Sequence, residues 1–94
     1  MNLAHCRQRL SQAIKALAIG VGAIQERLKE ANHDLLGLTH DEFPDDMQEE
    51  FKEVKDDGLD QLSEEKILAL PAQDAVNLAK KLFDLYLKVQ RPPA

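Results

Sequence analysis

Apolar residues recur at alternating gaps of four and three along the N-terminal third of the chain. This spacing places apolar side chains along one face of an α-helix, with mostly polar or small residues elsewhere. The pattern predicts one long helix over residues 3–36, after which Gly37 can end the helix in the left-handed conformation. The stripe consists of Leu10, Ile14, Leu17, Val21, Ile24, Leu28, Ala31 and Leu35.

Three further segments show helical spacing, and each is bounded by residues that begin or end helices. Pro44, followed by two aspartates, predicts a short helix over residues 44–57. A second short helix is predicted over 63–70, where the serine at its start can act as an N-cap. Pro71 ends that helix and precedes a long one over 72–90, whose apolar face extends more than halfway round.

These elements predict an all-α fold: a small helical bundle in which the two long helices pair and the two short ones pack across them. Glycine and proline number only four each, which favours helices over a turn-rich β fold. The length suits a single domain over residues 1–94, and residues 91–94 are expected to form a disordered tail.

The first predicted helix contains two glycines, one beside the apolar stripe and one on the side away from it, and each should cost about 1 kcal/mol relative to alanine. Gly20 adjoins a row of alanines, which suggests close approach of another helix, by analogy with small-residue contacts in membranes. Around residues 16–24 the predicted helix is apolar on every side, and a short chain has few helices to cover it. We therefore expect a two-fold homodimer, with a self-sufficient monomer as the alternative. The expected self-association surface is Ala13, Ala16, Ile19, Gly20, Ala23, Val76, Phe83 and Leu87.

Charge is unevenly distributed along the chain. The formal net charge is −5, but twelve acidic residues and two lysines lie between positions 41 and 65. Such a block is either a solvated face or a surface that docks on a basic partner protein. In the second case the chain could inhibit a nucleic-acid enzyme by imitating its acidic ligand, whereas direct nucleic-acid binding is not expected because the basic residues are scattered. The expected acidic partner surface is Asp45, Asp46, Glu49, Glu50 and Glu53.

The residues that could perform chemistry do not form a recognisable catalytic or metal-binding motif. Glu30 and His33 have the Glu-x-x-His spacing of di-metal bundles, but the motif occurs once and on the polar side of the helix. Cys6 has no general base at a suitable helical spacing. We therefore expect no enzymatic activity, no cofactor and no metal, with a small enzyme or metal protein kept as the least favoured hypothesis.

The sequence also indicates a cellular setting. The longest apolar run has nine residues, far fewer than the roughly 20 that span a bilayer, so no membrane association is expected. A single cysteine excludes an internal disulfide and favours the reducing cytoplasm. The favoured function is a non-catalytic interaction module that self-associates and regulates or neutralises a partner protein.

One part of the sequence resembles a known group of proteins. The stretches "IQERLKEANHDLLGL" and "DEFPDDMQEEFKEVKDD", within residues 24–57, are similar to segments of small uncharacterised bacterial helical proteins. In that group a "QERL" segment precedes a leucine-rich helix end and a proline-started acidic helix. The resemblance implies a bacterial cytosolic protein and brings no activity or functional residue with it.

Overall fold

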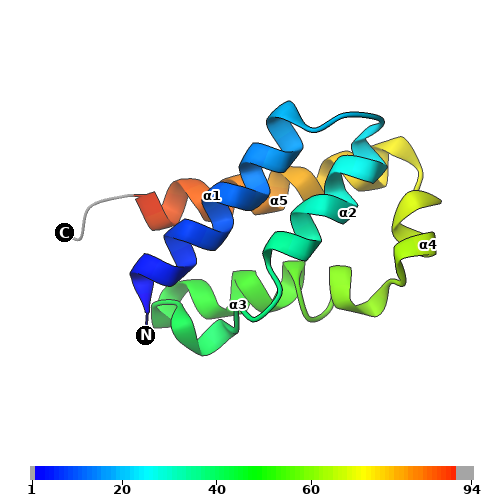
Figure 1. Ribbon diagram of the computed structural model, residues 1–94. Coiled ribbons are helices and arrows are strands. Elements are labelled where there is room, and N and C mark those ends of the chain that lie inside the picture. Colours follow the sequence, from blue (N-terminus) through cyan, green and yellow to red (C-terminus); the bar gives the residue numbers. More distant parts are fainter. Residues whose placement is uncertain (1, 91–94) are drawn as a thin grey trace.

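The computed structural model describes residues 2–90, which contain five α-helices and no β-strand. The all-α class predicted from the sequence is confirmed, whereas the predicted tail over 91–94 lies outside the described residues. Two short 3-10 helices, η1 (His40–Glu42) and η2 (Leu59–Gln61), flank the third helix. The α-helices, shown in Figure 1, are α1 (Leu3–Ile19), α2 (Ile24–Asp34), α3 (Asp45–Val54), α4 (Glu64–Leu68) and α5 (Ala72–Gln90).

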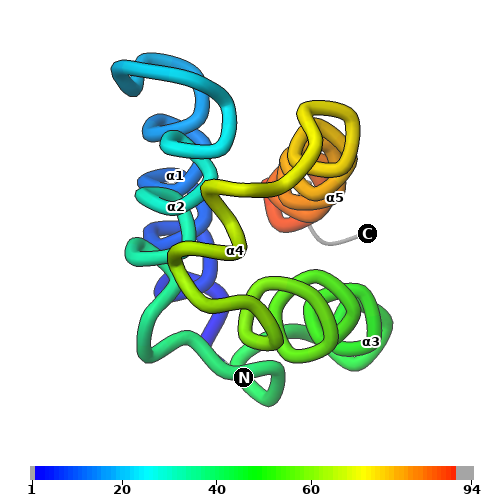
Figure 2. The backbone as a smooth tube through the Cα atoms, turned by 90° about the vertical axis from the view of Figure 1, so that its right-hand side faces the viewer, coloured from blue at the N-terminus to red at the C-terminus, as the bar shows by residue number. Residues whose placement is uncertain are grey.

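The predicted helix over residues 3–36 is wrong at its centre, because the chain forms two helices there. After α1 the chain reverses direction, and α2 packs beside α1 as the second arm of a hairpin (Figures 1 and 2). A continuous helix of that length would measure about 50 Å, whereas the longest extent of the fold is 39 Å. The two halves of the apolar stripe therefore cover each other and the core of their own chain.

The two glycines build the turn between these helices. Gly20 donates its N–H to the Ala16 carbonyl oxygen, 2.9 Å away, and ends α1. Arg27 lies over this point and donates from Nη1 to the Leu17 carbonyl oxygen at 3.0 Å, and a Cβ on Gly20 would come within 2.8 Å of the Arg27 Cγ. Gly22 has a φ of +97°, in the left-handed region that favours glycine. Both glycines are therefore explained by the turn. The close approach of another helix, which the sequence suggested for Gly20, is not the reason for them.

The remaining helices form close to where the sequence places them. Gly37, with a φ of +83°, lies in the left-handed conformation predicted for it, and the Leu38 side chain beyond it is buried. Helix α3 begins directly after Pro44. The Ser63 hydroxyl accepts a hydrogen bond from the Lys66 N–H at 3.2 Å and caps α4. Both short helices are confirmed, although each is a few residues shorter than predicted.

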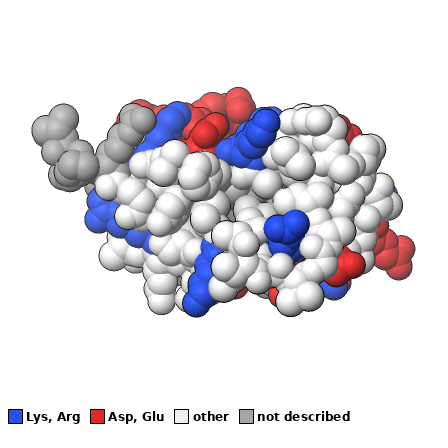
Figure 3. All heavy atoms as spheres, turned by 90° about the horizontal axis from the view of Figure 1, so that it is seen from above, with Lys and Arg blue, Asp and Glu red and all other residues white. Residues whose placement is uncertain are grey.

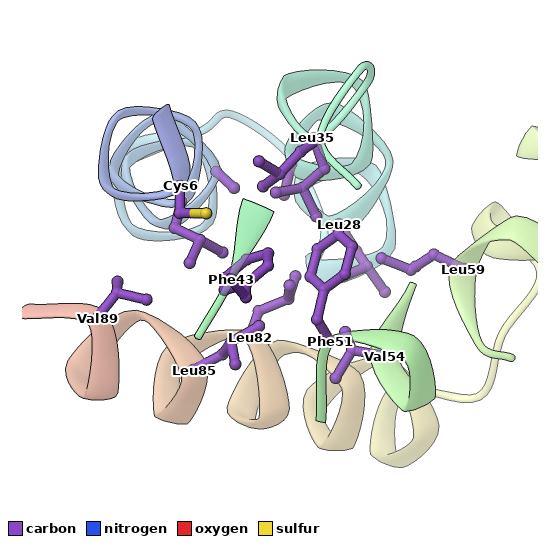
Figure 4. Close-up of a cluster of buried hydrophobic side chains, with 14 of the residues drawn as sticks. Cys6, Leu28, Leu35, Phe43, Phe51, Val54, Leu59, Leu82, Leu85 and Val89 are labelled. Atoms are coloured by element: carbon purple, nitrogen blue, oxygen red, sulfur yellow. The ribbon is translucent and has the colours of Figure 1, made fainter. Parts of the chain in front are cut away.

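A single apolar core joins the five helices. Helix α5 packs against α1 and α2 on one side and against α3 on another, as Figure 2 shows from the end of the bundle. The rings of Phe43 and Phe51 stack at the centre of this core with their centroids 4.5 Å apart (Figure 4). The other buried apolar residues are Cys6, Leu10, Ala13, Leu28, Ala31, Leu35, Leu38, Met47, Val54, Leu59, Ile67, Ala75, Leu82, Leu85 and Val89.

Candidate interaction surface

An open apolar groove lies between the C-terminal half of α1 and the middle of α5. The volume of the groove is about 400 Å³. Figure 3 shows this side of the molecule, where a broad area of uncharged atoms lies between the charged side chains. Seven of the nine residues that line the groove are apolar, and the other two are Lys80 and Asp84. The apolar lining consists of Ile14, Leu17 and Ala18 of α1, Ile24 of α2, and Val76, Ala79 and Phe83 of α5.

The groove exists because α5 is apolar around more of its circumference than its own chain can cover. Its inner face is buried in the core. Several residues on the adjoining outer face are also apolar. Of these, Val76 is half-buried, whereas Phe83 is 46% exposed and Leu87 is 44% exposed. The wide apolar face that the sequence predicts for this helix is therefore confirmed.

The α1 part of the predicted self-association surface is not a continuous face. Ala13 is completely buried by its own chain, so the expectation that it contacts a second chain is wrong, and Ala16 is half-buried against the core. Ile19, Gly20 and Ala23 are exposed, but they end α1 or belong to the turn, because the helix that would have aligned them is broken.

Three groove residues were assigned by the sequence pattern to the buried stripe. Ile14, Leu17 and Ile24 are instead only partly buried and form the wall opposite α5. These three residues have the same helical spacing as the fully buried residues of the stripe. The sequence therefore could not predict that they are partly exposed. Only the position of the hairpin turn, which brings α2 back along α1, decides which of them face outward.

The predicted acidic surface is largely retained on α3. Asp45, Asp46, Glu49 and Glu53 are exposed, and none of them forms an ion pair with another side chain of residues 2–90. Glu50 differs, because it pairs with Lys88 and thereby joins α3 to α5. Glu50 is therefore a structural contact within the chain.

The Cys6 thiol and the side chains of His5 and Glu42 form contacts between separate elements of the fold. The Cys6 thiol donates to the Glu42 carbonyl oxygen at 3.1 Å, and burial, reinforced by the Glu42 charge, raises the pKa of this thiol to about 11. The Glu42 carboxylate accepts from the Thr39 N–H at 2.9 Å and contacts His5 Nδ1 at 2.6 Å, which together hold its pKa below the ordinary value. These contacts attach η1 to the start of α1.

His33, the histidine of the Glu-x-x-His spacing, also forms a contact between helices. His33 Nε2 lies 2.6 Å from Glu64 Oε1 and joins α2 to α4, and the hydrogen bond from His33 is the main cause of a lowered pKa at Glu64. Across residues 2–90 no group of three His, Cys, Asp or Glu side chains gathers in a way that could hold a metal ion. In the same part of the chain, no helix is both long and apolar enough to cross a membrane.

Comparisons of the chain with protein-family models, with curated proteins and with solved structures find no match.

Proposed function

We propose that the protein is a cytoplasmic, non-catalytic interaction module that self-associates and regulates or neutralises a partner protein. The observation that carries this proposal is the open groove between α1 and α5. Phe83 lines this groove and is half-exposed, as is Leu87 one turn further along α5. Exposed apolar surface that is contiguous and bordered by charged side chains is typical of protein-binding sites. A groove between two helices suits an apolar helix in particular.

The state of the polar groups supports a binding role over a catalytic one. A nucleophilic cysteine must ionise, but Cys6 is buried and its pKa is about 11, so it remains a neutral thiol at physiological pH. His5 and His33 each contact a glutamate of another element and connect parts of the fold. These are structural uses of the residues that catalysis would need.

Replacing Phe83 with alanine is expected to weaken self-association about tenfold or more, because an aromatic anchor at the centre of an interface dominates its binding energy. Sedimentation equilibrium or light scattering coupled to size exclusion measures the change at tens of micromolar protein. The helix content of the variant should match that of the wild type, since the ring lies outside the core.

Leu36→Ala is the matched control, because Leu36 is 62% exposed but lies beyond the end of α2, away from the groove. Its association should equal that of the wild type. A wild-type chain that is monomeric throughout this concentration range would contradict the self-association part of the proposal.

A second candidate function is that of an acidic inhibitor that imitates nucleic acid on a basic protein surface. The observation that favours it is the set of four exposed carboxylates on α3, a helix that does not line the groove. None of the four forms an ion pair with a side chain in the described part of the chain. A like-charged face of this kind accelerates encounters with a basic partner. This surface excludes Glu50, which pairs with Lys88 within the chain.

Such binding should weaken steeply as salt concentration rises, because screening acts on exposed charges. The variant Glu49→Gln/Glu53→Gln leaves the first turn of α3 intact and should release partners from the native lysate at lower salt than the wild-type bait does. Glu26→Gln, at an exposed position on α2, removes a charge elsewhere and should change nothing. Capture that is equal for all three baits and insensitive to salt would contradict this function.

A further inference from the structure

We propose that the groove receives an amphipathic helix of a partner protein, and that acidic residues border the apolar face of this helix. The inference rests on the proposed function and specifies the partner segment that the groove binds. Val76 and Phe83, the first and last apolar residues of the α5 wall, are two helical turns or about 10 Å apart. An incoming helix can therefore place apolar side chains from two of its turns in the groove, at the spacing that helix-in-groove contacts use.

Each of the three helices that line the groove carries a cation beside it. Lys80 of α5 lines the groove itself. Arg27 of α2 donates from Nη1 to the carbonyl oxygen of the groove residue Leu17 at 3.0 Å, and its buried Nε finds no hydrogen-bond partner among the described residues. Lys15 of α1 is exposed one turn before Ala18, on the same side of that helix. Within residues 2–90 none of these three cations forms an ion pair.

The acidic residues around the groove do not balance these cations. Helix α1 contains no Asp or Glu, and Asp84 is the one carboxylate among the residues that line the groove. Glu26 and Glu30 of α2 line a separate hollow beside α4. Figure 3 shows Lys and Arg atoms within this face of the molecule, whereas most Asp and Glu atoms lie toward its edges. The groove is therefore bordered mainly by positive charge, although the whole chain has a net charge of −5.

The charges are also ordered along the groove. Gln25 Nε2 donates to the Leu70 carbonyl oxygen at 2.8 Å, so α5 begins beside the turn between α1 and α2. Lys80 is one helical turn nearer to this turn than Asp84 is, and Arg27 contacts the end of α1 there. The acidic residues of the incoming helix therefore belong at the end of the groove near the turn, and the residue opposite Asp84 is neutral or basic.

The same groove carries the proposed self-association, so a partner helix and a second copy of the chain exclude each other. A partner helix that covers Phe83 removes the apolar contact that a second copy would use. By mass action, such a partner shifts self-associated chains toward a complex that contains one chain. Binding of the acidic helix thus couples the assembly of this protein to the presence of its partner.

The test uses three synthetic helical peptides of about 15 residues. All three carry leucines at the same helical spacing, and the positions beside the leucines are glutamate, glutamine or lysine. Fluorescence anisotropy of each labelled peptide, titrated with the full chain at low salt, gives the affinity. The glutamate peptide should bind about fivefold more tightly than the glutamine peptide, and the lysine peptide more weakly than either. The net charge of −5 alone would favour the opposite order.

Two substitutions assign the binding to the groove. Phe83→Ala should weaken binding of the glutamate peptide about tenfold or more. Lysine-peptide binding that survives this substitution belongs to another surface, such as the acidic surface of α3, and does not count toward the order of affinities. Lys80→Glu should weaken the glutamate peptide about five- to tenfold and strengthen the lysine peptide.

Lys81→Glu is the matched control, because Lys81 is exposed and adjacent in sequence but does not line the groove. It changes the net charge equally and should leave all three affinities near their wild-type values. If the three peptides bind equally and Phe83→Ala removes their binding, the acidic partner is wrong and the groove remains an interaction site. If no peptide binds but the wild type dimerises through Phe83, this inference fails and the proposed function stands. If no peptide binds and the chain is a monomer, both fail.

Discussion

Replacing Gly22 with alanine is expected to lower the free energy of unfolding by about 2 kcal/mol, since a residue with a side chain is strained in the left-handed region. The φ of Gly22 is +97°, and a Cβ there would overlap the carboxylate of Glu26. The sign of this change is diagnostic. In an unbroken helix over residues 3–36, the same substitution would stabilise the protein by about 1 kcal/mol.

Thermal or urea denaturation followed by circular dichroism measures the effect. Gly37→Ala is the matched control: Gly37 has a φ of +83°, but a Cβ there would meet nothing within 4 Å. Its loss of stability reports the backbone strain alone, and the difference between the two variants reports the overlap with Glu26. A Gly22→Ala protein with a higher melting temperature than the wild type would contradict the hairpin.

Replacing Phe51 with alanine is expected to cost about 3–5 kcal/mol, the range for deleting a buried aromatic side chain. The ring is buried, stacks on Phe43 at 4.5 Å, and lies where α3 meets the rest of the core (Figure 4). A domain of this size has a stability near the lower end of about 5–15 kcal/mol. The variant should therefore be substantially unfolded on mild heating.

Phe83→Ala makes the same chemical change at a half-exposed position, so in a monomeric state its cost should be well below that of Phe51→Ala. Urea denaturation of both variants at low protein concentration provides the comparison. Equal losses of stability would show that Phe83 belongs to the core and would remove the surface role assigned to it.

The sequence predicted most of the helices because their signals are local. Pro44, Ser63, Pro71 and Gly37 act within one turn of the helix that they begin or end, and the structure uses each of them as expected. The failure at residues 20–23 has a different cause. The apolar spacing is present on both sides of the turn because both helices of the hairpin face the same core, and the exposed Val21 in the turn falls on the same spacing. Periodicity alone therefore could not reveal the reversal.

The same error affected the prediction of the interaction surface. Treating residues 16–24 as one helix made Val21 part of a buried stripe, whereas it is 92% exposed in the turn, and Ile19 is 68% exposed. The continuous apolar helix that we expected to form a dimer surface therefore does not exist. The α5 residues were placed more accurately, because that helix is unbroken and its wide apolar face follows directly from its spacing.

The acidic face of α3 and the groove are formed by different helices, so occupying one leaves the other accessible. A self-associated pair of chains would then present two copies of the acidic surface of α3 on one particle. A partner with two basic sites at a matching separation could engage both copies at once, and the second contact would be intramolecular. Two weak contacts would then combine into tight binding. This binding would require a protein concentration high enough for the pair to form.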